Sequence, residues 1–320
     1  MSAYTGSVII PSVAIYNNVE YAVTSIGDHA FSNCSSLTSV AIPEGVINIG
    51  ESAFSSCRTL SSVSIPKEVT NIGSGAFRDC KLLTSITIPE GVTTMGEEVF
   101  EGCESLVSIA IPEGITAISE QMFHGCSSLT SVSLTNSLKS IEKMAFDNCS
   151  SLVAVTIPDG VTLIDKKAFS ECTSLSKVTI GSGVSSIGER VFKDCYSLKS
   201  IISLIEEPFD LDEGVFTCSS SKYLEYYLGD FDFIYKNATL YVPKGTIDLY
   251  MQKEGWKKFY HIEEIDVTSI EPAKATTLRA PQHVFAADGR TVGRYENQGK
   301  GLLITRYADG STCKKIVTPK

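Results

Sequence analysis

The stretch AFSSCRTLSSVSIPKEVTNIGSG, from Ala53 to Gly75, is one copy of a unit that recurs every 23 residues in this 320-residue chain. Eight of the fourteen phenylalanines fall on this period: Phe31, Phe54, Phe77, Phe100, Phe123, Phe146, Phe169 and Phe192. So do nine of the ten cysteines: Cys34, Cys57, Cys80, Cys103, Cys126, Cys149, Cys172, Cys195 and Cys218. A fixed period of this length predicts a solenoid, in which each unit stacks on its neighbours.

The apolar spacing inside the unit predicts one strand and one tight turn. Leu60, Val63 and Ile65 have the L-x-x-L-x-L spacing of a leucine-rich repeat, and a proline follows the strand. Phe54 and Cys57 stand three residues apart, so a single helical turn directs both inward. We therefore expect a repeat solenoid of the leucine-rich repeat type. Its parallel β-sheet lies on the concave side, and short helical or 3₁₀ turns lie on the convex side.

The cysteine column admits three interpretations: free buried thiols, disulfides or metal ligands. Equivalent residues of stacked strands lie about 4.7–4.9 Å apart with parallel Cβ vectors, whereas a disulfide needs converging Cβ atoms about 3.8 Å apart. The sequence has no C-x-x-C pair for zinc. We favour buried thiols that donate weak hydrogen bonds to neighbouring loop carbonyls. Cys313 lies outside the column.

Both ends of the repeat array carry different patterns. Alternating apolar residues around Asn17-Asn18 predict an N-terminal β-hairpin. Towards the other end, Phe216 sits one place late, and the segment from Asn237 to Ile265 predicts a strand, a turn and a helical stretch. We expect this segment to cap the array, with Trp256 packed on the last coil.

These patterns predict five parts. They are an N-terminal cap with a hairpin and a partial repeat (1–30), regular repeats (31–204), degenerate repeats with a C-terminal cap (205–265), a linker (266–281) and a small β-module (282–320).

The composition argues against several classes of protein. With 27 basic and 37 acidic side chains, a net charge of −10 and no basic cluster, the chain is a poor candidate for binding nucleic acid. No apolar run approaches the ~20 residues that cross a bilayer. No catalytic motif of the G-x-S-x-G, H-E-x-x-H, P-loop or dinucleotide type occurs. We expect a non-enzymatic monomer without metal or cofactor.

The start of the chain bears on its location. Met1 to Tyr4 lacks the basic start and apolar stretch of a signal peptide. We therefore expect either an intracellular protein or a mature form from which a signal has been trimmed.

Candidate binding residues face outward beside the inward strand positions. On the sheet they are Ser62, Ser85, Thr87, Ser108, Ser131, Ser133, Thr156 and Lys177. On the rim that follows each strand they are Glu44, Glu90, Glu113 and Asp159. Small hydroxyl residues suit a tightly pleated sheet with no ligand at all, but their rows could also hydrogen-bond a peptide or a glycan. The acidic rim is either a solvated face or a surface that steers a basic partner.

The unit AFxxCxSLxxVxIPxGVxxIG, seen from Ala30 to Gly50, resembles the BspA-like leucine-rich repeats, and the resemblance covers roughly residues 4–265. The segment from Tyr241 to Trp256 is similar to the closing unit of that family. The resemblance implies a right-handed solenoid on exported or cell-surface proteins of anaerobic bacteria, with adhesion as the function and no shared catalytic residues. The tail from Gly301 is similar to C-terminal sorting modules of secreted proteins from such bacteria.

Two functions follow from these observations. The first is a secreted or cell-surface module that binds a host or bacterial protein or glycan along the sheet or the rim. The second is a passive scaffold or spacer whose binding or anchoring is carried by the C-terminal tail.

Overall fold

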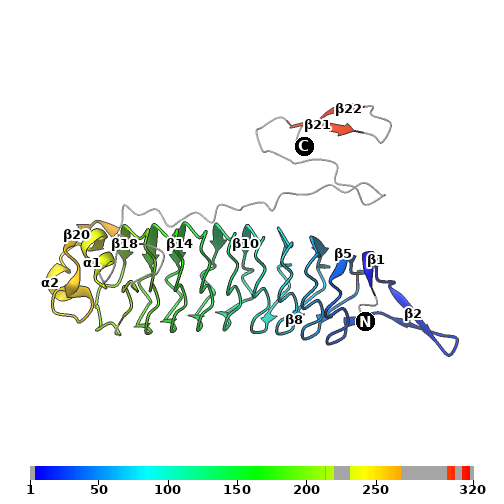
Figure 1. Ribbon diagram of the computed structural model, residues 1–320, viewed down its shortest axis with the longest axis horizontal. Helices are drawn as coiled ribbons and strands as arrows, with labels where there is room; N and C mark the ends of the chain where they lie inside the picture. Colours follow the sequence, from blue (N-terminus) through cyan, green and yellow to red (C-terminus); the bar gives the residue numbers. More distant parts are fainter. Residues whose placement is uncertain (1–3, 213, 220–230, 268–300, 307–311, 318–320) are drawn as a thin grey trace. The chain divides into compact units, whose positions relative to one another are not determined.

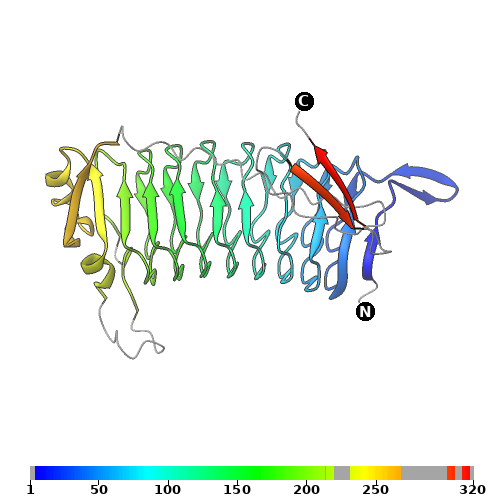
Figure 2. The same ribbon diagram turned by 90° about the horizontal axis from the view of Figure 1, so that it is seen from above.

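The computed structural model describes residues 4–212, 214–219, 231–267, 301–306 and 312–317. Two compact units make up the chain, Met1–Glu271 and Pro272–Lys320, and each is described by itself. In the first unit, successive coils of chain stack along one axis (Figures 1 and 2). The predicted repeat solenoid with a parallel sheet is therefore confirmed.

The longer strands of the coils form one row of parallel sheets, in the orders β1-β5-β7, β10-β12 and β14-β16-β18-β19-β20. Their bounds are β1 Thr5–Ile9, β5 Ser36–Ala41, β7 Ser62–Ser64, β10 Ser108–Ala110, β12 Ser131–Ser133, β14 Ala154–Ile157, β16 Lys177–Ile180, β18 Ser200–Ser203, β19 Thr239–Pro243 and β20 His261–Ile265. We call the outward side of this row, which corresponds to the side predicted as concave, the sheet face. Pairing joins equivalent residues of successive repeats, as in Val155 with Val178, so the 23-residue period sets the register.

A second row of two-residue parallel strands, which the repeat pattern did not predict, runs along another side of the coils. It consists of β4 Ser25–Ile26, β6 Asn48–Ile49, β8 Asn71–Ile72, β9 Thr94–Met95, β11 Ala117–Ile118, β13 Ser140–Ile141, β15 Leu163–Ile164 and β17 Ser186–Ile187. The second residue of each strand is buried. Where both rows are continuous, as at β5–β7 with β6–β8 and at β14–β16 with β15–β17, two separate strand ladders thus hold neighbouring coils together.

The turns between these rows are present as predicted, but the described coils form them without helix or 3₁₀ helix. The N–H groups of Ala53, Ser55 and Cys57 bond to the carbonyl three residues back in the same coil. The intervening N–H groups of Ser52, Phe54 and Ser56 bond to carbonyls of the next coil at 2.7–2.8 Å. A helix would satisfy all of these donors internally, so stacking has redirected half of them.

Left-handed residues make this alternation possible. Ser52 and Ser56 have φ of 51° and 58°, and equivalent positions keep φ positive in the following repeats, including Met144 and Lys167 at 56° and 58°. Such a conformation is unfavourable by roughly 1–2 kcal/mol for a residue with a side chain. It persists because the hydrogen bonds between coils require it at every repeat.

The core is a set of continuous side-chain ladders. Nine phenylalanine rings from Phe31 to Phe216 stack with centroids 5.1–5.7 Å apart and planes within 6–10° of parallel. The extra residue between Phe192 and Phe216 does not break the ladder, since these two rings lie 5.3 Å apart. Offset stacking of this kind adds about 0.5–1.5 kcal/mol per pair beyond the burial of apolar area.

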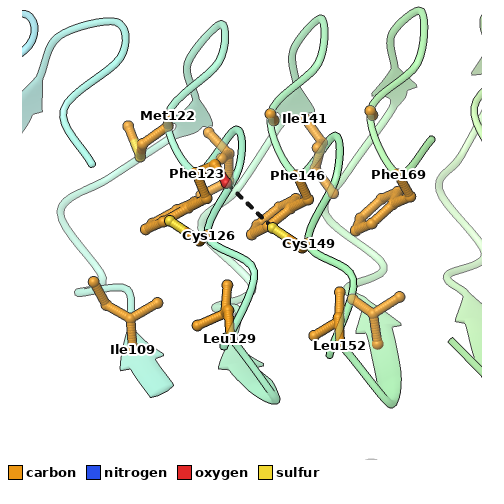
Figure 3. Packing of buried hydrophobic residues seen from close by; sticks show 14 of the residues in the cluster. Ile109, Met122, Phe123, Cys126, Leu129, Ile141, Phe146, Cys149, Leu152 and Phe169 are labelled. Atoms are coloured by element: carbon orange, nitrogen blue, oxygen red, sulfur yellow. Dashed lines mark hydrogen bonds between the residues drawn. The ribbon is translucent and has the colours of Figure 1, made fainter. Parts of the chain in front are cut away.

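The cysteine column forms a second ladder beside the rings, as predicted for buried free thiols. The nine cysteines of the column are buried and unbridged. The Cys149 Sγ donates to the Phe123 carbonyl of the preceding coil at 3.2 Å (Figure 3), and six other cysteines repeat this bond at 3.0–3.3 Å. Burial raises the pKa of the Cys57 thiol to about 12. The column is therefore structural, and its thiols are poor nucleophiles. The side chain of Cys313 lies outside the described residues.

Different elements close the two ends of the stack. The predicted hairpin is present as β2 Val13–Tyr16 and β3 Val19–Ala22, joined by Asn17 and Asn18 with φ of 50° and 61°. At the other end lie α1 Phe233–Asn237, α2 Ile247–Tyr250 and the 3₁₀ helix η1 Trp256–Lys258. Trp256 is fully buried with its ring 6.0 Å from that of Phe216, which confirms its predicted packing on the last coil.

The second unit contains an antiparallel pair, β21 Gly301–Arg306 with β22 Thr312–Val317. It agrees with the strands predicted there, whereas both Asp-Gly turns and residues 268–281 of the predicted linker lie outside the described residues. The division into five parts stays a prediction.

Close stacking leaves no room for a side chain at some glycines, which gives a first test of the coil spacing. A Cβ on Gly183 would lie 2.0 Å from the Asp159 carbonyl oxygen of the preceding coil, whereas one on Gly27 would meet nothing within 4 Å. We expect Gly183→Ala to destabilise the protein by about 1–3 kcal/mol, as overpacking does, and Gly27→Ala to change stability by less than about 0.5 kcal/mol. Thermal unfolding of the two variants measures the difference, and equal midpoints would show that the coils are not packed this closely.

Candidate functional site

The strand register lines up the candidate residues on the sheet face. Ser108 pairs with Ser131 on adjacent strands, and Ala154 pairs with Lys177 in the same column. None of the eight predicted sheet residues is buried: Ser85, Thr87, Thr156 and Lys177 are exposed, and Ser62, Ser108, Ser131 and Ser133 are half-buried. The structure thus brings them together on one outward side, and their role in binding stays a prediction.

A second column of outward-facing residues, which includes Thr156 and Thr179, lies beside the first. Its side chains become less exposed to solvent towards the C-terminal end. Thr179 is only 8% exposed, although its position in the repeat is an outward one. Its direct partner across the strands is Ile202, which replaces the small residues of earlier coils. The regular rows of serine and threonine therefore end near β16 and β18.

Larger and charged side chains continue the sheet face beyond the regular repeats. Register pairing carries one column from Lys177 through Ser200 and Thr239 to His261. The neighbouring column runs from Ile202 through Tyr241 to Glu263. We call Lys177, Tyr241, His261 and Glu263 the terminal patch; all four retain solvent exposure. The sequence predicted only Lys177 of this patch, because the parallel pairing of β18, β19 and β20 is what shows that the other three residues share its face.

The rim is exposed at its four predicted carboxylates. Two of them also have intramolecular roles, since Asp159 Oδ1 accepts hydrogen bonds from the Ser182 N–H and hydroxyl at 2.8 and 3.0 Å, and Glu113 accepts one from the Ser137 hydroxyl at 2.5 Å. A hydrogen bond to Glu68 and repulsion from that carboxylate raise the pKa of Glu44. The rim therefore combines structural acceptors with solvent-facing negative charge.

A third group, which we call the polar column, lies on the turns and was also missed from the sequence. It consists of Arg78, Glu101, His124, Asp147 and Ser170, at equivalent positions of five successive repeats. Arg78 Nε lies 2.9 Å from Glu101 Oε2, and the His124 ring nitrogens lie 3.4 Å from Glu101 Oε1 and 3.6 Å from Asp147 Oδ2. The 23-residue spacing of alternating charges could have revealed it.

Asp147 is the buried member of this column. The residue as a whole is 7% exposed. Burial raises its pKa above the ordinary 3.8, and repulsion from Glu171 acts in the same direction, whereas the Ser170 hydrogen bond and the charges of His124 and Lys167 oppose the rise. The protonated carboxyl is thus the form that folding favours. The stability this contributes is complete below pH 3.8 and is lost as the pH rises through the folded-state pKa.

An amide at this position should consequently stabilise the protein at neutral pH. We expect Asp147→Asn to raise the melting temperature at pH 7 by about 2–4 °C, the shift that about 1 kcal/mol produces in a large domain. The gain should shrink as the pH falls towards 3.8. Thermal melts across this pH range measure it, with Asp212→Asn at an exposed site as the control. A lower melting temperature for Asp147→Asn at neutral pH would contradict the assignment.

Two kinds of feature are absent from the described residues. No group of three or more His, Cys, Asp or Glu side chains in this part of the chain is arranged to hold a metal ion. No helix within the same residues has the length and apolar character needed to span a membrane.

The repeat is also found by comparison with known families. The profile of the BspA type leucine-rich repeat region, which spans six copies, matches residues 2–130 and 93–223. The chain belongs to this family. Among curated proteins, none matches the chain.

Several solved structures of bacterial leucine-rich repeat proteins are similar to this BspA-type chain. One from Bacteroides ovatus is 29% identical with a TM-score of 0.45, and the match covers 62% of this chain and 64% of that one. A leucine-rich cell surface protein from Faecalibacterium prausnitzii is 25% identical with a TM-score of 0.46, covering 82% and 88%. The T. pallidum leucine-rich repeat protein is 30% identical with a TM-score of 0.43, covering 60% and 77%. The chain thus spans less than two thirds of the Bacteroides ovatus protein.

Proposed function

We propose that this BspA-type protein is a non-catalytic recognition module, secreted or displayed at a bacterial surface, that binds a protein or a glycan through its sheet face. The observation that carries the proposal is the open sheet face itself, which ends in the terminal patch. A tyrosine, a lysine, a histidine and a glutamate there keep solvent exposure on one face. Tyrosine is enriched among the residues that dominate binding energy. Apart from Lys177, the candidate sheet residues of the regular repeats are only serine and threonine.

The polar character of the rows beside the patch suits a hydrogen-bonding partner. Rows of serine and threonine at the strand spacing of about 4.8 Å present donors and acceptors in a fixed lattice. The acidic rim adds long-range attraction for a partner with basic groups, and this attraction weakens as salt concentration rises. We propose that the patch supplies most of the affinity and that the rim supplies orientation and association rate.

The experiment compares matched variants in binding to immobilised extracts of host matrix and of bacterial surfaces. Lys177→Ala and Tyr241→Ala should each weaken binding about tenfold, equivalent to about 1.4 kcal/mol. The rim variant Glu90→Lys with Glu113→Lys should slow association. Lys143→Ala is the control, because Lys143 is a partly exposed lysine that pairs with Glu120 on the turns. Unchanged binding by the patch and rim variants would reject recognition through the sheet face.

The alternative is a spacer whose binding or anchoring belongs to the tail. The resemblance of the tail to sorting modules favours it, together with the separate compact unit that begins at Pro272. Deletion of residues 266–320 distinguishes the two functions. Recognition through the sheet face survives this deletion, whereas a spacer loses all binding.

A further inference from the structure

The two ends of the coil stack are closed to different degrees. At the C-terminal end, Phe216 is fully buried and its ring contacts those of Tyr235, Trp256 and Phe259. At the N-terminal end, Phe31 is covered by the ring of Tyr4 at 4.9 Å, and Tyr4 itself is 43% exposed. The apolar ladders beside it end in Val8, Ile10 and Val23, which are only partly buried. The N-terminal end of the core is therefore covered less completely than the C-terminal end.

The edge strands at the two ends also differ. Within the described residues, β1 and β20 each lie at the end of their sheet with a strand neighbour on one side only. The exposed His261, Glu263 and Glu264 of β20 place charge along its edge, a common device against unwanted strand pairing. β1 has the sequence TGSVI without any charge, and its Ile9 is 79% exposed. In the part of the chain that the structure describes, no strand pairs with the outward backbone groups of β1.

An apolar hairpin extends this end. Every residue of β2 and β3 is exposed, and the hairpin projects beyond the first coil (Figure 1). Its large apolar side chains are Val13, Ile15, Tyr16, Val19 and Tyr21, with exposures of 41–72%. The register of the hairpin places Tyr16, Val19 and Tyr21 on one of its faces, and Val13 and Ile15 on the other face beside Glu20. Exposed apolar side chains gathered on a projecting element suit an interaction site. Between Tyr4 and Gly27 the only charged residue is Glu20, in a chain with a net charge of −10.

We propose that the N-terminal end is a dimerisation surface whose occupant is a second copy of this chain, arranged about a two-fold axis. Two acidic chains repel one another over most of their surface but not at this nearly neutral end. A two-fold axis runs β1 antiparallel to its copy, which pairs the outward backbone groups of both strands. A head-to-tail arrangement would instead set uncharged β1 against the charged edge of β20. The two-fold arrangement also lets each hairpin cover apolar residues of the other chain.

This proposal replaces the monomer expected from sequence, because the sequence pattern did not show that the whole hairpin remains uncovered. Sedimentation velocity and light scattering on the full chain over a wide concentration range test it. We expect a mass of twice 34.5 kDa that dissociates on dilution. Ile9→Lys and Ile15→Lys should each raise the dissociation constant about tenfold or more, equivalent to at least about 1.4 kcal/mol.

Leu249→Lys is the matched control, since Leu249 is a 44% exposed apolar residue at the opposite end. It should leave the dimer intact. All three substitutions affect exposed side chains, and unchanged far-ultraviolet circular dichroism verifies that the variants are folded. A monomer at every concentration overturns the proposal, as does a dimer that survives Ile9→Lys combined with Ile15→Lys or one that Leu249→Lys dissociates.

Discussion

Replacing Phe100 by alanine is expected to destabilise the protein by about 3–5 kcal/mol, the usual effect of truncating a buried aromatic residue. Phe100 is fully buried, and its ring stacks on those of Phe77 and Phe123 at 5.7 and 5.6 Å. Its removal therefore weakens two interfaces between coils at once. In a linear array each repeat is stabilised by its two neighbours, so the loss divides the stack near its middle.

Urea unfolding followed by circular dichroism measures the effect of Phe100→Ala, and Ser85→Ala is the control. Ser85 is exposed on the sheet face, and its truncation should change stability by less than about 0.5 kcal/mol. The fluorescence of Trp256, the only tryptophan in the chain, reports separately on the C-terminal end. Similar midpoints for the two variants would contradict the inward and outward assignment of these positions.

Trp256→Ala should also lower the free energy of unfolding by about 3–5 kcal/mol. Here, however, we expect unfolding to begin at a different place in the stack. The indole ring is fully buried, and its Nε1 donates a hydrogen bond to the Phe209 carbonyl at 3.0 Å. The substitution leaves a cavity beside Phe216 and removes the partner of that carbonyl. Because this ring closes the stack, unfolding should begin at the C-terminal coils and progress along the array.

Hydrogen exchange resolved along the chain tests this order for Trp256→Ala. Protection should fall first between Leu198 and Ile265 and should persist in the coils between Ala53 and Leu152. Tyr260→Ala is the control, since the Tyr260 side chain is 69% exposed and only its backbone N–H bonds to Tyr235. A uniform loss of protection along the whole stack would show that Trp256 does not act as a terminal cap.

The core could be predicted because each of its main residue types recurs at the same 23-residue spacing. Phe54, Cys57 and Leu60 are fully buried, as are their equivalents in most repeats, and the apolar pattern alone assigned them. The hairpin at Asn17-Asn18 could also be predicted from adjacent residues, because asparagine tolerates the positive φ of a two-residue turn. Such features depend on neighbours in sequence and hence appear in the sequence itself.

The turns illustrate what a local pattern cannot give. A spacing of three residues between Phe54 and Cys57 is compatible with a helical turn, and nothing local excludes it. The adjacent coil decides the outcome, because its carbonyls accept the N–H groups of Ser52, Phe54 and Ser56. Those partners lie 22 residues away in sequence and become neighbours only when the coils stack.

Some of the candidate sites could likewise be predicted from the sequence, and others could be seen only in the structure. The rows of serine and threonine were visible from the repeat, whereas the terminal patch needed the pairing of β18 with β19 and of β19 with β20 across an irregular segment. The contacts of His124 with Glu101 and Asp147 likewise depend on three coils lying in register. Spacing could suggest this polar column, but only the packing shows that Asp147 is buried.

The sequence by itself determined the period, the inward residues of each coil and the family, since a 23-residue repeat of apolar side chains can be buried only by stacking. The tertiary structure decided which backbone donors join one coil to the next, which charged groups meet and how completely each end is closed. The physical reason is that hydrogen bonding and burial at these places depend on groups supplied by adjacent coils. Those groups are distant in sequence and are fixed only by the finished stack.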